Sequence, residues 1–154
     1  KFLEMQDYQN ALLDIQKAIE LDAKDSAKYM SLGYVKYIYF DEHEAGLEDL
    51  NKALSLDPEN SLAYLFRGKV NSYISDKYVE KSDYKKVAQY LNASISDYSK
   101  SLEHYTDDFN PYFKRLYPFG YLNQIYGSRG RQYYNLGIFY KSIRVYLLNI
   151  FYYG

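Results

Sequence analysis

The amino-acid sequence predicts an all-α protein made of helix pairs that stack on one another. Three observations favour this fold class. Apolar residues recur at three- and four-residue steps in several segments of residues 1–108, which is the spacing of a helix that buries one face. Short sequence phrases return 35 residues further along the chain, which indicates a repeated structural unit. No alternation of apolar and polar residues typical of a strand runs for a useful length in residues 1–108.

The first predicted helix covers residues 7–22 and carries its apolar residues on one face, at Ala11, Leu12, Ile15, Ala18 and Ile19. Two later segments repeat its core: Asp14–Ile19 aligns with Asp49–Leu54 and with Asp97–Leu102. The middle segment stops at Asp57-Pro58, because proline lacks an N–H and disfavours helix in the residue before it.

A second kind of helix is marked by the phrase that runs from Tyr to Gly. The phrase occurs in "KYMSLGY" (28–34), "AYLFRGK" (63–69) and "QYYNLGI" (132–138). Its glycines, Gly33 and Gly68 in the first two copies, let a partner helix approach closely, as Ala18 and Ala53 do on the other kind of helix. The predicted unit is therefore a pair of helices, one of each kind.

In these residues the sequence resembles the tetratricopeptide repeat family, whose units are helix–turn–helix pairs of about 34 residues. Tyr29, Leu32 and Gly33 match the first-helix pattern, and Pro58 takes the proline place. Lys36, Arg67 and Ala23 depart from the family pattern. The resemblance implies a right-handed superhelical stack of antiparallel pairs, with a partial first repeat at 1–25, a repeat at 26–60 and an elongated repeat at 61–108. Since the chain starts inside a repeat, we expect a fragment of a longer array.

The third pair is longer than the second by about 13 residues, counted between its small-residue positions. Seven extra residues per helix make about two turns, which keeps the same face inward. Apolar residues continue at helical steps through both segments, so we expect a protruding helical hairpin with its tip near Glu80–Asp83. A disordered insert is the competing interpretation.

Residues 109–154 form an aromatic, basic segment. Asn110-Pro111 is typical of a helix start, Pro118 and Gly120 would interrupt that helix, and residues 127–130 (GSRG) are expected to form a turn. Tyr133, Leu136, Gly137 and Tyr140 match the first-helix pattern, which predicts a helix at 131–150. It could cap the stack or open a fourth repeat. Lys141 and Arg144 interrupt its apolar run, so no transmembrane segment is expected.

Composition limits the possible chemistry. The 154 residues include 22 Tyr and no Cys, which excludes disulfides, cysteine nucleophiles and cysteine metal sites. The absence of Cys does not identify the cellular compartment of the protein, and we favour the cytoplasm. Residues 1–108 carry 13 Lys/Arg and 20 Asp/Glu, whereas residues 109–154 carry 6 Lys/Arg and no acid. Such an asymmetry between the halves can mark a surface that meets a partner, or it can help successive chains or segments to attract one another.

No catalytic or cofactor-binding pattern is apparent, so we do not expect an enzyme. The two histidines lack the spacing of metal ligands, and His43 is expected in a solvated turn. The "GSRGR" stretch lacks the glycine spacing and the Lys-Ser/Thr ending of a phosphate-binding loop.

The resemblance implies a concave groove that binds a peptide or a partner helix, as in a protein-interaction scaffold. The positions that follow each signature Tyr would line it; they are Met30, Tyr34, Tyr37, Leu65, Lys69, Ser72 and Tyr73. The same positions could instead pack against a neighbouring helix or face water. Met30 and Tyr34 stand where a carboxylate-binding Lys and Asn would be needed in some family members, so that clamp is not expected.

Two other interactions remain open at this point. Arg129, Arg131 and Lys141 alternate with tyrosines, a composition that suits anionic surfaces or single-stranded nucleic acid, although six cations are few for nucleic-acid binding. Self-association is also possible, if the basic end of one chain meets the acidic half of another.

Overall fold

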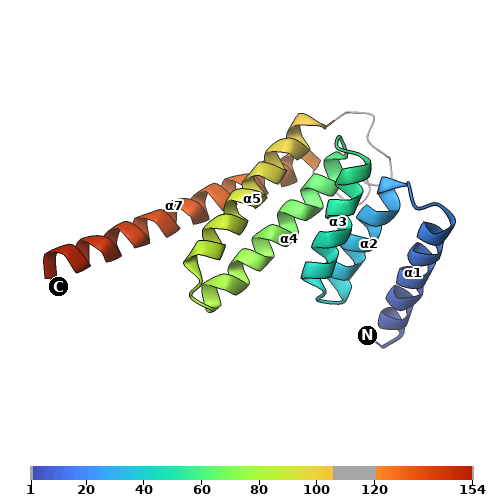
Figure 1. The fold of residues 1–154 in the computed structure, drawn as a ribbon, viewed down its shortest axis with the longest axis horizontal. Helices are drawn as coiled ribbons and strands as arrows, with labels where there is room; N and C mark the ends of the chain where they lie inside the picture. Colours follow the sequence, from blue (N-terminus) through green and yellow to red (C-terminus); the bar gives the residue numbers. More distant parts are fainter. Residues whose placement is uncertain (1, 106–120, 154) are drawn as a thin grey trace.

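The computed structural model describes residues 2–105 and 121–153, and in these two stretches it contains six helices and no strand (Figure 1). Each helix contacts the next one along the chain, and α2 also contacts α4. The all-α prediction is thereby confirmed. The helices are α1 (Phe2–Leu21), α2 (Ser26–Tyr39), α3 (His43–Leu56), α4 (Ser61–Glu80), α5 (Tyr84–Glu103) and α7 (Tyr121–Tyr153).

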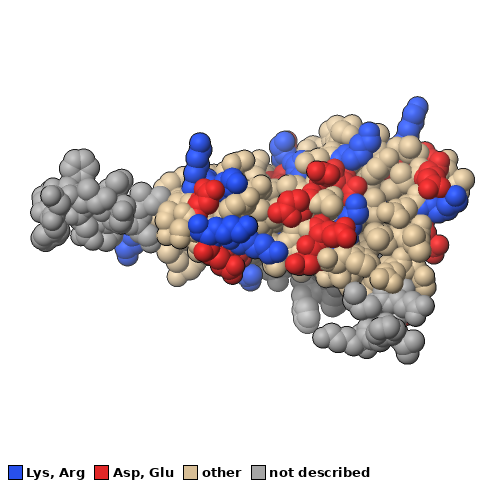
Figure 2. Space-filling model, turned by 60° about the horizontal axis from the view of Figure 1, so that its bottom comes forward, with Lys and Arg blue, Asp and Glu red and all other residues tan. Residues whose placement is uncertain are grey.

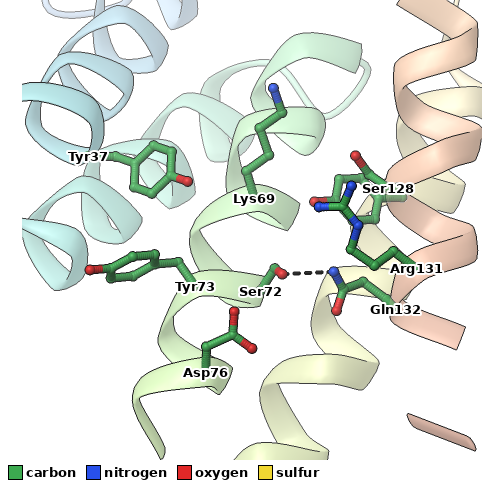
Figure 3. Close-up of a pocket in the computed structure, with 9 residues that line it drawn as sticks. Tyr37, Lys69, Ser72, Tyr73, Asp76, Ser128, Arg131 and Gln132 are labelled. Atoms are coloured by element: carbon green, nitrogen blue, oxygen red, sulfur yellow. Dashed lines mark hydrogen bonds between the residues drawn. The ribbon is translucent and has the colours of Figure 1, made fainter. Parts of the chain in front are cut away.

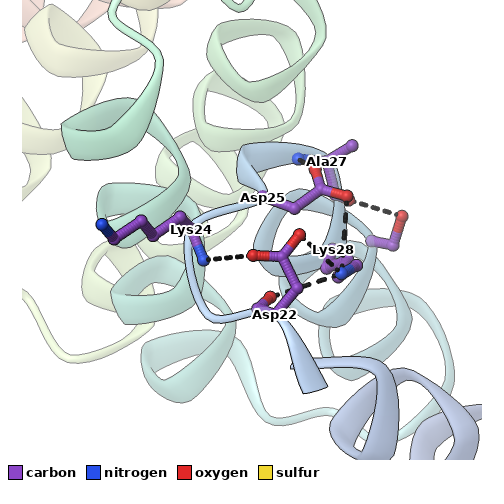
Figure 4. Close-up of polar contacts among 6 residues, drawn as sticks. Asp22, Lys24, Asp25, Ala27 and Lys28 are labelled. Atoms are coloured by element: carbon purple, nitrogen blue, oxygen red, sulfur yellow. Dashed lines mark hydrogen bonds and ion pairs between the residues drawn. The ribbon is translucent and has the colours of Figure 1, made fainter. Parts of the chain in front are cut away.

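Two carboxylates, those of Asp22 and Asp25, hold the turn between α1 and α2 (Figure 4). Asp25 is the N-cap of α2, and its Oδ1 accepts a hydrogen bond of 2.9 Å from the backbone N–H of Ala27. Asp22 accepts from the backbone N–H of Lys24 at 3.1 Å, and the Nζ of Lys28 lies 3.2 Å from its Oδ2. These bonds lower the pKa of Asp22. They satisfy donors that would otherwise be left open at the helix start.

The contact between α2 and α3 depends on two glycines. Gly33 and Gly46 are both buried, and a Cβ placed on Gly33 would lie 2.7 Å from the carbonyl oxygen of Gly46. A Cβ on Gly46 would lie 2.8 Å from the carbonyl oxygen of Gly33. The two backbones therefore touch at a separation that any larger residue would prevent.

Helices α4 and α5 form the long hairpin expected from the sequence. Each has 20 residues, against 14 in α2 and in α3, and they are joined by a turn at 81–83. Gly68 of α4 faces the ring of Tyr98 of α5, and the Oγ of Ser94 donates to the carbonyl oxygen of Gly68 at 2.8 Å. Because residues 81–83 are only a short turn between helices, the disordered-insert interpretation was wrong.

The hydrophobic core extends from α2 to α7. Leu50, Ala53, Leu65 and Val70 are fully buried, and Ile125 of α7 joins the same cluster. Gly68 and Ala53 are thus buried between helices, as the sequence predicts, whereas Ala18 of α1 is half-buried.

Two of the departures from the family pattern pair with the repeated Asp. The Nζ of Lys36 lies 2.7 Å from Oδ2 of Asp49. The guanidinium group of Arg67 donates two hydrogen bonds, of 2.6 and 3.0 Å, to the carboxylate of Asp97. Asn71 donates a further bond of 2.9 Å to Asp97, whose side chain is almost completely buried. Helices α2 and α4, which carry the Tyr-to-Gly phrase, therefore each bring a cation to the Asp of the helix that follows, and the cation offsets part of the cost of burying that charge.

The turn predicted at 127–130 is wrong, because α7 is continuous from Tyr121 to Tyr153. A Cβ on Gly127, Gly130 or Gly137 would meet nothing within 4 Å, so no packing forces a break and the helical hydrogen bonds continue. The predicted helix start at Asn110 and the interruption at Pro118 and Gly120 fall outside the described residues. No helix of the described stretches is long and apolar enough to cross a membrane.

Candidate functional site

Four of the seven predicted groove residues meet at one cavity of about 270 Å³ (Figure 3). Lys69, Ser72 and Tyr73 come from successive turns of α4, and Tyr37 comes from the last turns of α2. The hydroxyl of Tyr73 also reaches Oδ1 of Asp41, at 3.5 Å. Helical spacing on α4 and the close α2–α4 contact bring these side chains together.

The other three predicted residues do not line this cavity. Met30 and Leu65 are buried in the hydrophobic core, with 6% and 0% of their surface exposed. Tyr34 is half-buried, and its ring lies 4.3 Å from that of Phe66. The contact of α2 with α4 covers these three positions, so they pack against a neighbouring helix. This is the alternative to a groove position that the sequence had left open.

Helix α7 forms the opposite wall of the cavity with Ser128, Arg131 and Gln132. The side-chain amide of Gln132 donates to the Oγ of Ser72 at 2.8 Å, which ties α7 to α4. Its carbonyl oxygen, Oε1, is buried and receives no hydrogen bond from any described residue. One turn earlier on α4, the Nζ of Lys69 donates to Oε1 of Gln124 at 3.2 Å. The cavity thus combines the amino group of Lys69 from α4 with an acceptor on α7, Oε1 of Gln132, that receives no hydrogen bond from a described residue.

Burial shifts the titration of the groups that line the cavity. It raises the pKa of Tyr98, which also lines the cavity, to about 12, and it raises the pKa of Tyr37, so both hydroxyls stay neutral near physiological pH. Burial also lowers the pKa of Lys69. The pKa of Asp76 is raised by burial and by the nearby charge of Glu80. The cavity therefore offers neutral hydroxyls between charges of both signs.

His43 is not a solvated turn residue. Its side chain is 3% exposed, and its ring lies 4.0 Å from that of Tyr73 and 5.5 Å from that of Tyr37, both edge to face. Nε2 of His43 is 3.0 Å from Oδ1 of Asp41, but neither ring nitrogen makes a well-directed hydrogen bond with a described residue. Burial lowers its pKa, and the charge of Lys77 adds to this effect. His43 therefore supports the aromatic wall of the cavity.

Sequence reasoning missed the residues that complete the cavity. Asp76 could have been found, because it follows Ser72 and Lys69 at helical steps on the same face of α4. Tyr98 belongs to the repeated segment Asp97–Leu102, and its ring both lines the cavity and covers Gly68. Ser128 belonged to the stretch interpreted as a turn, whereas Arg131 began the helix predicted at 131–150, and only the continuous α7 places both at the cavity.

A second, more apolar cavity of about 430 Å³ follows the first along the crevice between the hairpin and α7. Asp76 lines both cavities, and the α7 residues continue at helical steps from Gln132 to Asn135 and Phe139. Its hairpin side is formed by Ser75 and Asp76 and by the larger side chains of Val79, Tyr84, Val87 and Leu91. The crevice is thus polar at one end and apolar at the other.

The described residues contain no group of three or more His, Asp or Glu side chains placed to hold a metal ion. On the face shown in Figure 2, Lys and Arg are mixed with Asp and Glu, and neither sign dominates. The chemistry that the crevice supports is therefore hydrogen bonding to polar groups at one end and burial of an apolar group at the other.

Compared with known protein families and with curated proteins, the chain gives no match.

Proposed function

We propose that this chain is a tetratricopeptide-type helical-repeat module that binds an extended peptide segment of a partner protein in the crevice between α4 and α7. The helix pairs would continue as a superhelical stack of antiparallel units, in which α7 would be the next helix that carries the Tyr-to-Gly phrase. The motif spacing and the glycine contact of Gly33 and Gly46 support the family assignment.

The observation that carries the proposal is the polar cavity, with its buried acceptor at Gln132. A buried carbonyl oxygen without a donor costs about 1–3 kcal/mol. A peptide N–H that entered the cavity would supply the missing bond to Oε1 of Gln132. The hydroxyls of Ser72 and Tyr37 could serve the neighbouring peptide groups, since a hydroxyl both donates and accepts.

The apolar end of the crevice adds a side-chain preference. An extended chain advances about 3.3 Å per residue, so a few residues beyond the polar cavity reach the apolar one. We expect the bound segment to place a hydrophobic side chain between Val87 of the hairpin and Phe139 of α7. Area buried there would contribute about 25 cal/mol per Å².

Selection of a random peptide library displayed on phage against the immobilised chain tests this function. Selected peptides should bind the variants Lys69→Met and Ser72→Ala about tenfold more weakly. Lys85→Met is the matched control, since Lys85 is exposed and lines neither cavity. Failure to enrich any peptide, or equal binding to all three variants, would refute the proposed crevice.

A further inference from the structure

Two hydrogen-bond acceptors that line the polar cavity receive no donor from the described residues. Gln132 of α7 is 3% exposed, and its Oε1 is one of them. The other is the carboxylate of Asp76 on α4, which forms no hydrogen bond or ion pair with a described residue. In Figure 3 both groups lie on the same side of the hydrogen bond that joins Ser72 to Gln132. We call the carboxylate of Asp76 and Oε1 of Gln132 the acceptor pair.

The carboxylate of Asp76 lacks a compensating charge. Burial and the like charge of Glu80 raise its pKa, and no cation of the described residues opposes this shift. Asp49 and Asp97, by contrast, each meet a cation, at 2.7 and 2.6 Å. Asp76 is exposed, so a ligand can reach it from solvent. A ligand that carries a positive charge would therefore supply what the folded chain does not.

The two cations that line the cavity are directed elsewhere. Lys69 stands seven residues before Asp76 on α4, which is roughly 10 Å along the helix, and its Nζ donates to Gln124. In Figure 3 the guanidinium group of Arg131 lies beside Ser128 and away from Asp76. The cavity is therefore basic toward Lys69 and acidic toward Asp76, and a positive ligand group fits the Asp76 side.

Aromatic rings border the acidic side of the cavity. Tyr37 and Tyr73 both line it, and their ring centroids are 6.2 Å apart, edge to face. The Nζ of Lys77 lies 4.9 Å from the centroid of the Tyr73 ring, whereas no described Lys or Arg lies over the ring of Tyr37. A guanidinium group can stack on such a ring while its N–H groups bond to oxygens beside it.

We propose that the acidic side of the cavity binds an arginine side chain of the partner's peptide, with its guanidinium group held by the acceptor pair. This inference rests on the proposed function, because it assigns a residue type to the peptide that the crevice would bind. Two N–H groups of the guanidinium would bond to the two oxygens of Asp76, and a third would bond to Oε1 of Gln132. Oε1 has two lone pairs, so it can accept from the guanidinium and from a peptide N–H together.

The acceptor pair favours arginine over other side chains. Lysine presents its donors from a single nitrogen, whereas the planar fork of arginine matches a carboxylate and reaches a further acceptor. An acidic side chain would meet Asp76 and a second acceptor, so it would add repulsion and leave Oε1 of Gln132 without a donor. Citrulline has nearly the shape of arginine but no charge, and it therefore separates the effect of charge from that of size.

Titration with N-acetyl-L-arginine amide tests the site without any peptide library. The carboxyl signal of Asp76 is followed by NMR across the acidic pH range in the 154-residue chain with ¹³C-labelled Asp, and the signal is assigned by its loss in Asp76→Asn. The arginine amide should lower the pKa of Asp76 from its raised value, because a bound cation favours the ionised carboxylate. N-acetyl-L-citrulline amide should bind about tenfold more weakly. Equal binding of the two amides, or an unchanged pKa of Asp76, would overturn the proposal.

A matched pair of variants locates the contact. Asp76→Asn should weaken binding of the arginine amide by about tenfold, because the charge of the acceptor pair is lost. Glu80→Gln removes the next acid of α4, which lines neither cavity, so it should change the affinity by less than about twofold. Both residues are exposed, so circular dichroism should show unchanged helix content. If Asp76→Asn binds the arginine amide as well as the parent does, the assigned contact is wrong.

Peptide selection on phage distinguishes this proposal from the proposed function. Peptides selected on the parent chain should share an arginine, and Asp76→Lys should select peptides with Asp or Glu in its place. Peptides that bind the crevice without a shared arginine would leave the proposed function standing and would overturn the arginine site. If no peptide is enriched, the proposed function fails, and the titration with the arginine amide alone decides whether the acceptor pair binds a guanidinium group.

Discussion

The sharpest test of the fold is the substitution Gly33→Ala. The new Cβ would lie 2.7 Å from the carbonyl oxygen of Gly46, 2.8 Å from Cγ of Leu50 and 3.2 Å from the backbone nitrogen of Leu50. Two of these atoms are backbone, so α3 must move by several tenths of an ångström. Overpacking of this kind costs about 1–3 kcal/mol, and the rigid neighbours favour the upper part of that range.

The helix propensity of alanine offsets part of this cost. Ala is favoured over Gly inside a helix by about 1 kcal/mol. The net expectation is a loss of about 1–2 kcal/mol in the free energy of unfolding, which lowers the melting temperature by roughly 5 °C at this chain length. Thermal and urea unfolding followed by circular dichroism would measure it.

Gly137→Ala is the matched control, because it makes the same chemical change in a helix where a Cβ meets nothing within 4 Å. Only the propensity gain of about 1 kcal/mol remains there, so this variant should be as stable as the parent or more stable. If Gly33→Ala is as stable as Gly137→Ala, then the backbones of α2 and α3 are not in contact and the glycine argument fails.

Three further predictions concern polar groups. Arg67→Leu should cost about 3–5 kcal/mol, because it leaves the carboxylate of Asp97 buried without its cation, and Asp97→Leu in the same chain should recover much of the loss in urea unfolding. The pKa of His43 is lower in the folded chain than in the unfolded chain, so on acidification His43 is protonated first in the unfolded chain. The contribution of neutral His43 to the free energy of unfolding is therefore fully present above pH about 6.5 and is lost as the pH falls below that value. Melting temperatures measured between about pH 7 and pH 5 should drop less for His43→Gln, and an equal drop would exclude His43 as the cause. Asn60→Ala should cost about 1 kcal/mol in thermal unfolding, since Asn60 caps α4 through the N–H of Ala63 at 2.9 Å; no change would show that water replaces the cap.

The sequence was informative wherever local pattern and packing agree. The helices from α1 to α5 follow from apolar spacing, and the turn at 81–83 follows from the count of extra residues in the third pair. Gly33 and Gly68 were predicted to allow close approach, and both lie against a partner helix. The apolar spacing identified these helices because each helix must bury one face, so apolar residues recur at three- and four-residue steps in every helix.

The candidate site was predictable only in part. The α4 residues of the cavity share one face by helical spacing, which the sequence shows directly. Met30 and Leu65 satisfy the same spacing rule but are buried, because the rule says nothing about how closely α2 and α4 approach. His43 was misplaced for the same reason, since its burial depends on the rings of Tyr37 and Tyr73 from two other helices.

By itself the sequence determined the class of fold, the two kinds of helix and the small residues that let them touch, because these depend on periodicity and on side-chain size along one chain. Only the tertiary structure decided that α7 runs unbroken through its glycines and that Arg131 and Gln132 face α4 across a cavity. The physical reason is that a glycine permits a turn without requiring one: whether the helix breaks depends on neighbours that contact it, and those neighbours are distant in sequence.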